Sequence, residues 1–180
     1  MRKIIAIIIF CVLSMTLTGC ENTRVSDNSE ISNSNRVIKW FDSLNGDEMI
    51  WYGTKEYNLD EFSDVTFRWS HASLEAVTGE KAVTLYTGTP IWSVYFCDLT
   101  GDGNPEICST ISIGSGMVDN RIIVYDYARG LSCELSDRLN FDYVLNMQEG
   151  SLIVEKRGYM QDELIESGEL VFQDGMLIVE

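Results

Sequence analysis

Short segments of β-branched and aromatic residues recur along most of this chain, with turn residues between them. Glycine-containing pairs such as Glu149-Gly150 and Asp174-Gly175 separate several of the segments. Apolar segments joined by such turns are typical of antiparallel hairpins. The segments are 65–69, 82–86, 91–97, 107–113, 121–127, 141–146, 152–156, 170–172 and 176–179. The pattern predicts an all-β fold with little helix: an antiparallel meander arranged as a sandwich or as a small propeller-like stack of sheets.

Two further features refine this prediction. Segments 149–155 and 174–180 share the pattern acid-Gly-x-Leu-Ile-Val-Glu, which indicates one hairpin tip used twice. Residues 37–44 and 160–166 could each form a helical turn or two, although neither has convincing caps.

The amino terminus has the order of a secretory signal. Arg2 and Lys3 precede an apolar run over 4–13, and small and polar residues follow. The run is shorter than the roughly 20 residues that a membrane helix needs. It ends at Leu-Thr-Gly-Cys, residues 17–20, which resembles the lipobox of bacterial lipoproteins. That resemblance implies a lipid on Cys20 and a place on the extracytoplasmic face of the cell membrane; the alternative is a signal peptide cut elsewhere.

Composition divides the chain into three parts. Residues 1–19 are the expected signal peptide, 20–36 are the lipidated cysteine and a polar, disordered tether, and 37–180 are a single β-rich extracytoplasmic domain. Loss of two basic residues with the signal takes the formal charge from −15 to −17. A nucleic-acid partner is therefore not expected, because binding a polyanion requires clustered Lys and Arg.

Three of the five cysteines remain for the domain once Cys11 leaves with the signal and Cys20 takes lipid. Cys97 and Cys108 flank one loop, and export permits a disulfide between them. Their apolar surroundings favour buried thiols for these two and for Cys133.

The loop between segments 91–97 and 107–113 carries the most specific pattern. Asp98, Thr100, Asp102 and Glu106 place side-chain oxygens at positions one, three, five and nine, and Asn104 offers a backbone carbonyl at position seven. Calcium takes six to eight oxygen ligands, and a glycine at position six permits the sharp turn. An EF-hand is excluded because serine stands at position twelve and the flanks are strands. We expect a structural calcium ion on a β-hairpin; the alternative is a Gly/Asp-rich turn that binds nothing.

This loop resembles the calcium loops of integrin-type FG-GAP and VCBS repeats. The longer stretch 92–127, with SVYFCDLTGDGNPEICSTISIGSGMVDNRIIVYDY at its core, is similar to an extracytoplasmic domain of Firmicutes. The similarity extends from Trp40 to near the end of the chain. That domain occurs as free lipoproteins and at the carboxyl end of BlaR1-like membrane peptidases. The resemblance implies a sensing role with an envelope protein or a membrane sensor or peptidase as partner.

Catalytic patterns are weak. His71 is the one histidine, so the His-Glu-x-x-His zinc site of those peptidases cannot form. The Gly-Ser-Gly of 114–116 is not a nucleophile elbow, because Ser112 stands where glycine is required. Acid pairs are too frequent to single out a glycosidase site. An envelope-polymer hydrolase with a carboxylate or His71-based site remains the alternative to a non-enzymatic binding or sensing module.

The aromatic residues admit two interpretations. Trp40, Trp51, Trp69 and Trp92 lie in apolar contexts, which favours packing in the core. An exposed tryptophan strip would instead suit capture of a glycan or peptide.

Overall fold

The computed structural model describes the backbone of residues 38–43 and all of residues 53–180. A single 3-10 turn, η2 (Asp60–Phe62), is the only helix in this part of the chain. The strands are β1 (Ile38–Ser43), β2 (Lys55–Asn58), β3 (Thr66–Trp69), β4 (Ser73–Thr78), β5 (Lys81–Thr87), β6 (Ser93–Cys97), β7 (Glu106–Ile113), β8 (Asp119–Asp126), β9 (Leu131–Leu135), β10 (Phe141–Gln148), β11 (Ser151–Gly158), β12 (Leu164–Gln173) and β13 (Met176–Val179).

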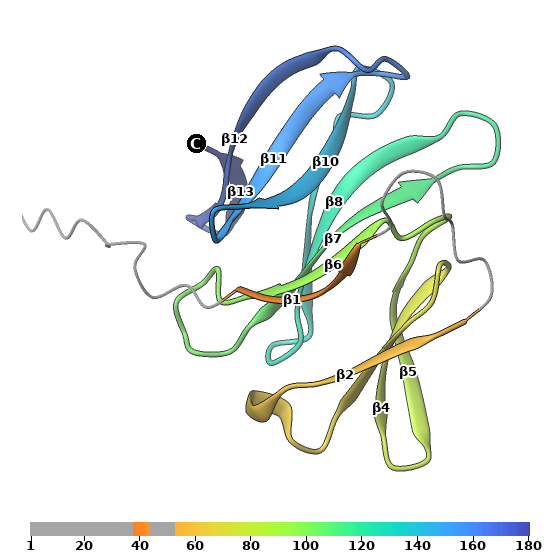
Figure 1. Ribbon diagram of the computed structural model, residues 1–180, viewed down its shortest axis with the longest axis vertical. Helices are drawn as coiled ribbons and strands as arrows, with labels where there is room; N and C mark the ends of the chain where they lie inside the picture. The colour runs from red at the N-terminus through yellow and green to blue at the C-terminus, as the bar shows by residue number, and fades with distance from the viewer. Residues whose placement is uncertain (1–37, 44–52) are drawn as a thin grey trace, which may run out of the picture. The chain divides into compact units, whose positions relative to one another are not determined.

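The strands form three antiparallel sheets (Figure 1). One sheet has five strands in the order β1-β6-β7-β8-β9, and two have four strands, in the orders β2-β3-β4-β5 and β10-β11-β12-β13. In each sheet the successive strands form a meander. In the five-stranded sheet β1 also pairs with β6 along its edge. The predicted all-β, antiparallel meander with little helix is confirmed.

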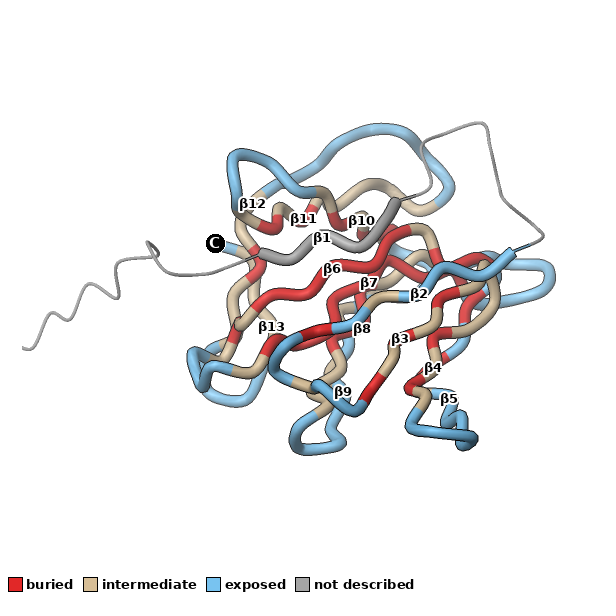
Figure 2. Tube along the Cα trace, turned by 60° about the horizontal axis from the view of Figure 1, so that its bottom comes forward, coloured by how far each residue is buried: buried red, intermediate tan, exposed pale blue. Residues whose placement is uncertain are grey.

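Alternate residues of β6 enter two different hydrophobic cores. Val94 and Phe96 belong to a cluster with residues of β3, β4 and β5. Tyr95 and Cys97 belong to a second cluster with residues of β10, β11 and β12. Successive side chains of a strand point to opposite faces, and a cluster covers each face of β6, so every residue of β6 is buried. Figure 2 shows this burial along β6 and neighbouring β7. The five-stranded sheet is therefore a middle layer, and each large side chain buried on it contributes about 1.5–3 kcal/mol.

Both predicted copies of the hairpin tip are present as two-residue turns. The φ angles are 50° and 88° at Glu149 and Gly150, and 53° and 82° at Asp174 and Gly175. Positive φ at both central residues is the type I′ geometry, which matches the twist of paired strands. The turns connect β10 to β11 and β12 to β13.

Several sequence predictions need correction. Residues 38–43 form β1 and residues 164–166 begin β12, so the helical turns that the sequence allowed within 37–44 and 160–166 are replaced by strand at these positions. Strand pairing with β6 and with β11 overrides the weak local helical tendency. Strands β2, β4 and β9 were not predicted. β2 and β9 are short edge strands that stay largely exposed; β2 has a single apolar residue, whereas β9 alternates as Leu-Ser-Cys-Glu-Leu and was missed.

Most of the described aromatic residues pack in the first cluster, as expected. The ring centroid of Phe67 lies 5.3 Å from that of Phe96 and 5.2 Å from that of Tyr127. Tyr57 stacks on Phe96 at 5.6 Å. Trp69 is 4% exposed, which confirms its place in the core.

Trp92 does not follow that prediction. It is only partly buried and lines a cavity, because the chain enters β6 just after it at the margin of the middle sheet. The side chains of Trp40 and Trp51 lie outside the described residues.

The described cysteines are thiols. Cys97 and Cys108 are buried in the second cluster, as the preferred interpretation expected, whereas Cys133 is only partly buried. The signal peptide, Cys20 and the tether fall outside the described residues. Within residues 38–43 and 53–180, no helix has the length and apolar character to cross a membrane.

Candidate metal centre

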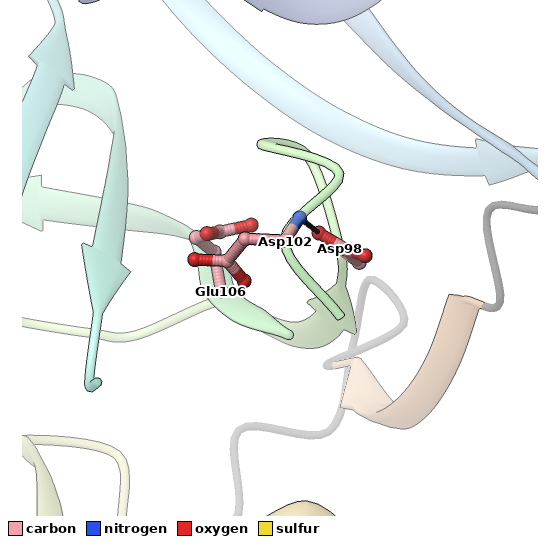
Figure 3. A group of neighbouring side chains, drawn as sticks. All are labelled: Asp98, Asp102 and Glu106. Carbon is pink, nitrogen blue, oxygen red and sulfur yellow. Dashed lines mark hydrogen bonds between the residues drawn. The ribbon is translucent and has the colours of Figure 1, made fainter. Parts of the chain in front are cut away.

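The predicted loop connects β6 to β7 at the end of the middle sheet. Cys97 and Glu106 are paired across the two strands, so the intervening residues close into a tight turn. Figure 3 shows three acidic side chains gathered on this turn. One oxygen each of Asp98, Asp102 and Glu106 lies within 4.8 Å of the others, the only such acidic, His or Cys group among the described residues.

Asp98 organises the turn by accepting backbone hydrogen bonds. Its Oδ1 accepts from the N–H of Gly101 at 2.7 Å and of Asp102 at 3.1 Å, and its Oδ2 accepts from Gly103 at 2.9 Å. Gly101 and Gly103 have φ of +73° and +88°, a region that other residues rarely adopt. A Cβ at either glycine would meet no other atom within 4 Å, so backbone conformation rather than space requires them.

Glu106 anchors the loop from inside the protein. The residue is 2% exposed. Its Oε2 accepts from the N–H of Leu99 at 2.7 Å and of Thr100 at 3.3 Å, and its Oε1 accepts from the Thr100 hydroxyl at 2.9 Å. Burial raises the pKa of Glu106; the hydrogen bonds oppose this shift, and the nearby charge of Asp126 adds to it.

Asp102 connects the loop to a residue that sequence analysis missed. Its Oδ1 accepts from the backbone N–H of Asn104 at 2.8 Å and from the Asn104 amide at 3.2 Å. Its Oδ2 accepts from Nη2 of Arg129 at 2.8 Å, and Arg129 also lies 3.3 Å from Asp126. Arg129 is 27 residues away in the chain, in the turn between β8 and β9, so no local spacing could reveal it.

The oxygen atoms of the loop suit a hard cation. An ionised carboxylate has about four lone-pair sites, and Asp98, Asp102 and Glu106 each accept three hydrogen bonds. Each therefore keeps about one site for a ligand. The Thr100 hydroxyl oxygen and the Asn104 carbonyl are the further ligands that the spacing predicts, and with water they would approach the six oxygens that calcium requires. The structure brings the three predicted carboxylates together, with the Thr100 hydroxyl bonded to Glu106 and the Asn104 amide bonded to Asp102.

The other sequence candidates, His71 and the Gly-Ser-Gly of 114–116, lie apart from this loop in strand connections. His71 lies in the turn between β3 and β4, where its carbonyl accepts from the N–H of Ile91 at 2.8 Å. Gly114 has φ of +122°, and a Cβ there would lie 2.3 Å from the Met117 carbonyl oxygen. The Gly-Ser-Gly sequence therefore forms a turn that requires glycine, as expected, instead of a nucleophile elbow.

Comparison with known proteins finds no matching family model, no matching curated protein and no matching solved structure.

Proposed function

We propose that this chain is a membrane-anchored extracytoplasmic lipoprotein whose β-rich domain is a calcium-stabilised, non-enzymatic binding or sensing module of the cell envelope. The anchor is the lipid expected on Cys20, and the partner is an envelope protein or a membrane sensor or peptidase. One observation carries the calcium part: the convergence of the three carboxylates of Asp98, Asp102 and Glu106 on one turn.

The ion has a structural role in this proposal. The loop joins β6 and β7, whose residues are buried on both faces of the middle sheet. Three carboxylates on a short turn repel one another, and a divalent cation relieves this repulsion. Ordering the turn therefore stabilises the pairing of the two most buried strands.

Two of the three described buried acids, Glu106 and Asp142, favour a binding module over a hydrolase. Glu106 holds Leu99 and Thr100, as described above. Asp142, 7% exposed, accepts from the N–H of Asn120 at 3.0 Å and of Met160 at 2.9 Å. Carboxylates committed to backbone donors serve to fix loops and are poorly placed to exchange protons with a substrate.

Thermal unfolding of the compact unit, residues 33–180, tests the calcium site. Extracellular calcium modules bind at about 10⁻⁴ to 10⁻³ M, and linkage gives roughly 1.4 kcal/mol at tenfold saturation. Millimolar calcium should raise the melting temperature of metal-free wild type by a few degrees and leave Asp98→Asn and Asp102→Ala nearly unchanged. Equal wild-type melting temperatures in calcium and in chelator would show that the loop is only a turn.

A further inference from the structure

A cavity of about 620 Å³ lies between the middle sheet and the sheet β10–β13. We call it the inter-sheet cavity, and its size falls within the range of about 300–1,000 Å³ found for small-molecule sites. The second hydrophobic cluster closes the rest of this interface with apolar side chains. The lining that bears on ligand binding is Trp92, Asn120, Asp142, Asn146, Arg157 and Gln161.

A continuous chain of hydrogen bonds fixes the wall of the cavity. The Trp92 indole N–H donates to Oγ of Ser112 at 2.6 Å, and that hydroxyl donates to Oδ1 of Asn120. The Asn120 N–H donates to Oδ1 of Asp142 at 3.0 Å, and Oδ2 of Asp142 accepts from the N–H of Met160. The chain ties both sheets and the turn after β11 together, so the wall is preorganised.

Three carboxamides on this wall have hydrogen-bonding capacity left over. The side chains of Asn146 and Gln161 make no hydrogen bond to any described residue, and the amide nitrogen of Asn120 likewise makes none. Each amide nitrogen offers two donors, and each free amide oxygen offers two acceptor sites. A ligand rich in groups that both donate and accept would satisfy them.

Charge excludes anionic ligands from the cavity. Arg157 is the one cation among the described residues of the lining, and it is already paired with Oε2 of Glu155 at 2.6 Å and with Asp162 at 3.9 Å. Asp142 and Asp162 leave the lining net negative, on a chain of net charge −15. Phosphates and other anions are therefore repelled.

One aromatic residue of the lining, Trp92, narrows the ligand class further. The Trp92 N–H is held by Ser112, which leaves the apolar ring of a partly buried side chain at the cavity. An apolar ring beside carboxamides and a fixed carboxylate matches a sugar, which has C–H faces and a rim of hydroxyl groups. We propose that the inter-sheet cavity binds a neutral saccharide. This inference deepens the proposed binding function and rests on it, but it does not depend on calcium.

Titration calorimetry of the full chain in a detergent without a sugar headgroup tests the proposal. The probes are chitotetraose and cellotetraose, which are neutral, and tripolyphosphate, which is anionic. The variants are Asn146→Ala and Gln161→Ala, singly and together. Gln148→Ala is the matched control, because it removes an exposed amide two residues further along the same face of β10, outside the cavity lining.

At least one neutral probe should bind the wild type, and the double variant should lose about tenfold or more in affinity. Gln148→Ala should bind as the wild type does, and all variants should melt with the wild type because these side-chain amides make no hydrogen bond to any described residue. Binding of neither sugar, equal affinity of the double variant, or preference for tripolyphosphate would overturn the proposal. Each titration is run in calcium and in chelator, beside a melting curve in both. Sugar binding without a calcium-induced melting shift refutes the metal site alone. A calcium-induced melting shift without sugar binding refutes the saccharide site alone.

Discussion

Replacing Glu106 separates the structural contribution of its carboxylate from its proposed role as a calcium ligand. Glu106→Ala removes the acceptor of three hydrogen bonds, one of them from the Leu99 N–H at 2.7 Å. Leu99 is 4% exposed, and its N–H keeps the Cys97 carbonyl at 3.0 Å as an acceptor but loses its shorter bond to a charged group, at a cost of about 1.5–3 kcal/mol. The two Thr100 donors are more accessible to water and add less.

We therefore expect Glu106→Ala to lower the free energy of unfolding by about 2–3 kcal/mol in chelator, which corresponds to roughly 5–10 °C in melting temperature. Glu106→Gln keeps an acceptor oxygen for Leu99, and the Thr100 hydroxyl can rotate to accept from the new amide. Its cost should stay below about 1 kcal/mol.

The assay is urea unfolding and thermal melting of residues 33–180 in chelator and in millimolar calcium, at neutral pH. In chelator the order of stability should be wild type, then Glu106→Gln, then Glu106→Ala. In calcium only the wild type should gain stability, because neither variant supplies the third carboxylate. Wild-type stability for Glu106→Ala in chelator, or a full calcium response in Glu106→Gln, would refute the reasoning.

Four further predictions follow from other parts of the chain. Cells that express the wild type should incorporate a fatty-acid analogue into the protein, and Cys20→Ser should abolish both the label and membrane retention; an unlabelled wild type would contradict the anchor. Residues 33–180 should show no zinc-dependent proteolysis, since the chain has one histidine; chelator-sensitive cleavage of casein would contradict this. Arg129→Gln should tighten calcium binding measured by calorimetry, because the guanidinium that bonds Asp102 no longer competes with the ion; unchanged or weaker binding would show that Arg129 does not oppose the cation. Burial raises the pKa of the Tyr86 hydroxyl above its ordinary value of 10.0, so the native state keeps a proton that the unfolded chain releases, and stability should fall as the pH rises past about 10; this fall should be smaller in Tyr86→Phe.

Much of the local structure follows from the sequence because the signals are short-range. Segments that are rich in β-branched and aromatic residues form strands, and the Glu149-Gly150 and Asp174-Gly175 pairs form type I′ turns. The calcium-loop prediction also depended on spacing alone, since glycines and acids within one turn determine where their oxygens can meet. The structure gathers these oxygens, while calcium itself stays a prediction.

Edge strands show where sequence patterns lose information. β2 is largely exposed and has one apolar residue, Tyr57, so it carries no apolar alternation; β9 alternates as Leu-Ser-Cys-Glu-Leu, but it is short and largely exposed and was missed. Residues 38–43 become β1 through pairing with β6, a partner about fifty residues away in the chain that local propensity does not specify.

Only the tertiary structure decided how the sheets are layered and what lies between them. The strand β6 is apolar at successive positions, which shows that both faces are buried but not which residues cover each face. Packing against two different sheets assigned Phe96 to one core and Tyr95 to the other. The same packing brought Arg129 to Asp102 and left Trp92 at a polar cavity. These contacts join residues far apart in the chain. The sequence by itself therefore determined most of the strands, the hairpin turns and the loop, whereas the packing of the sheets determined β1 and the neighbours of every strand.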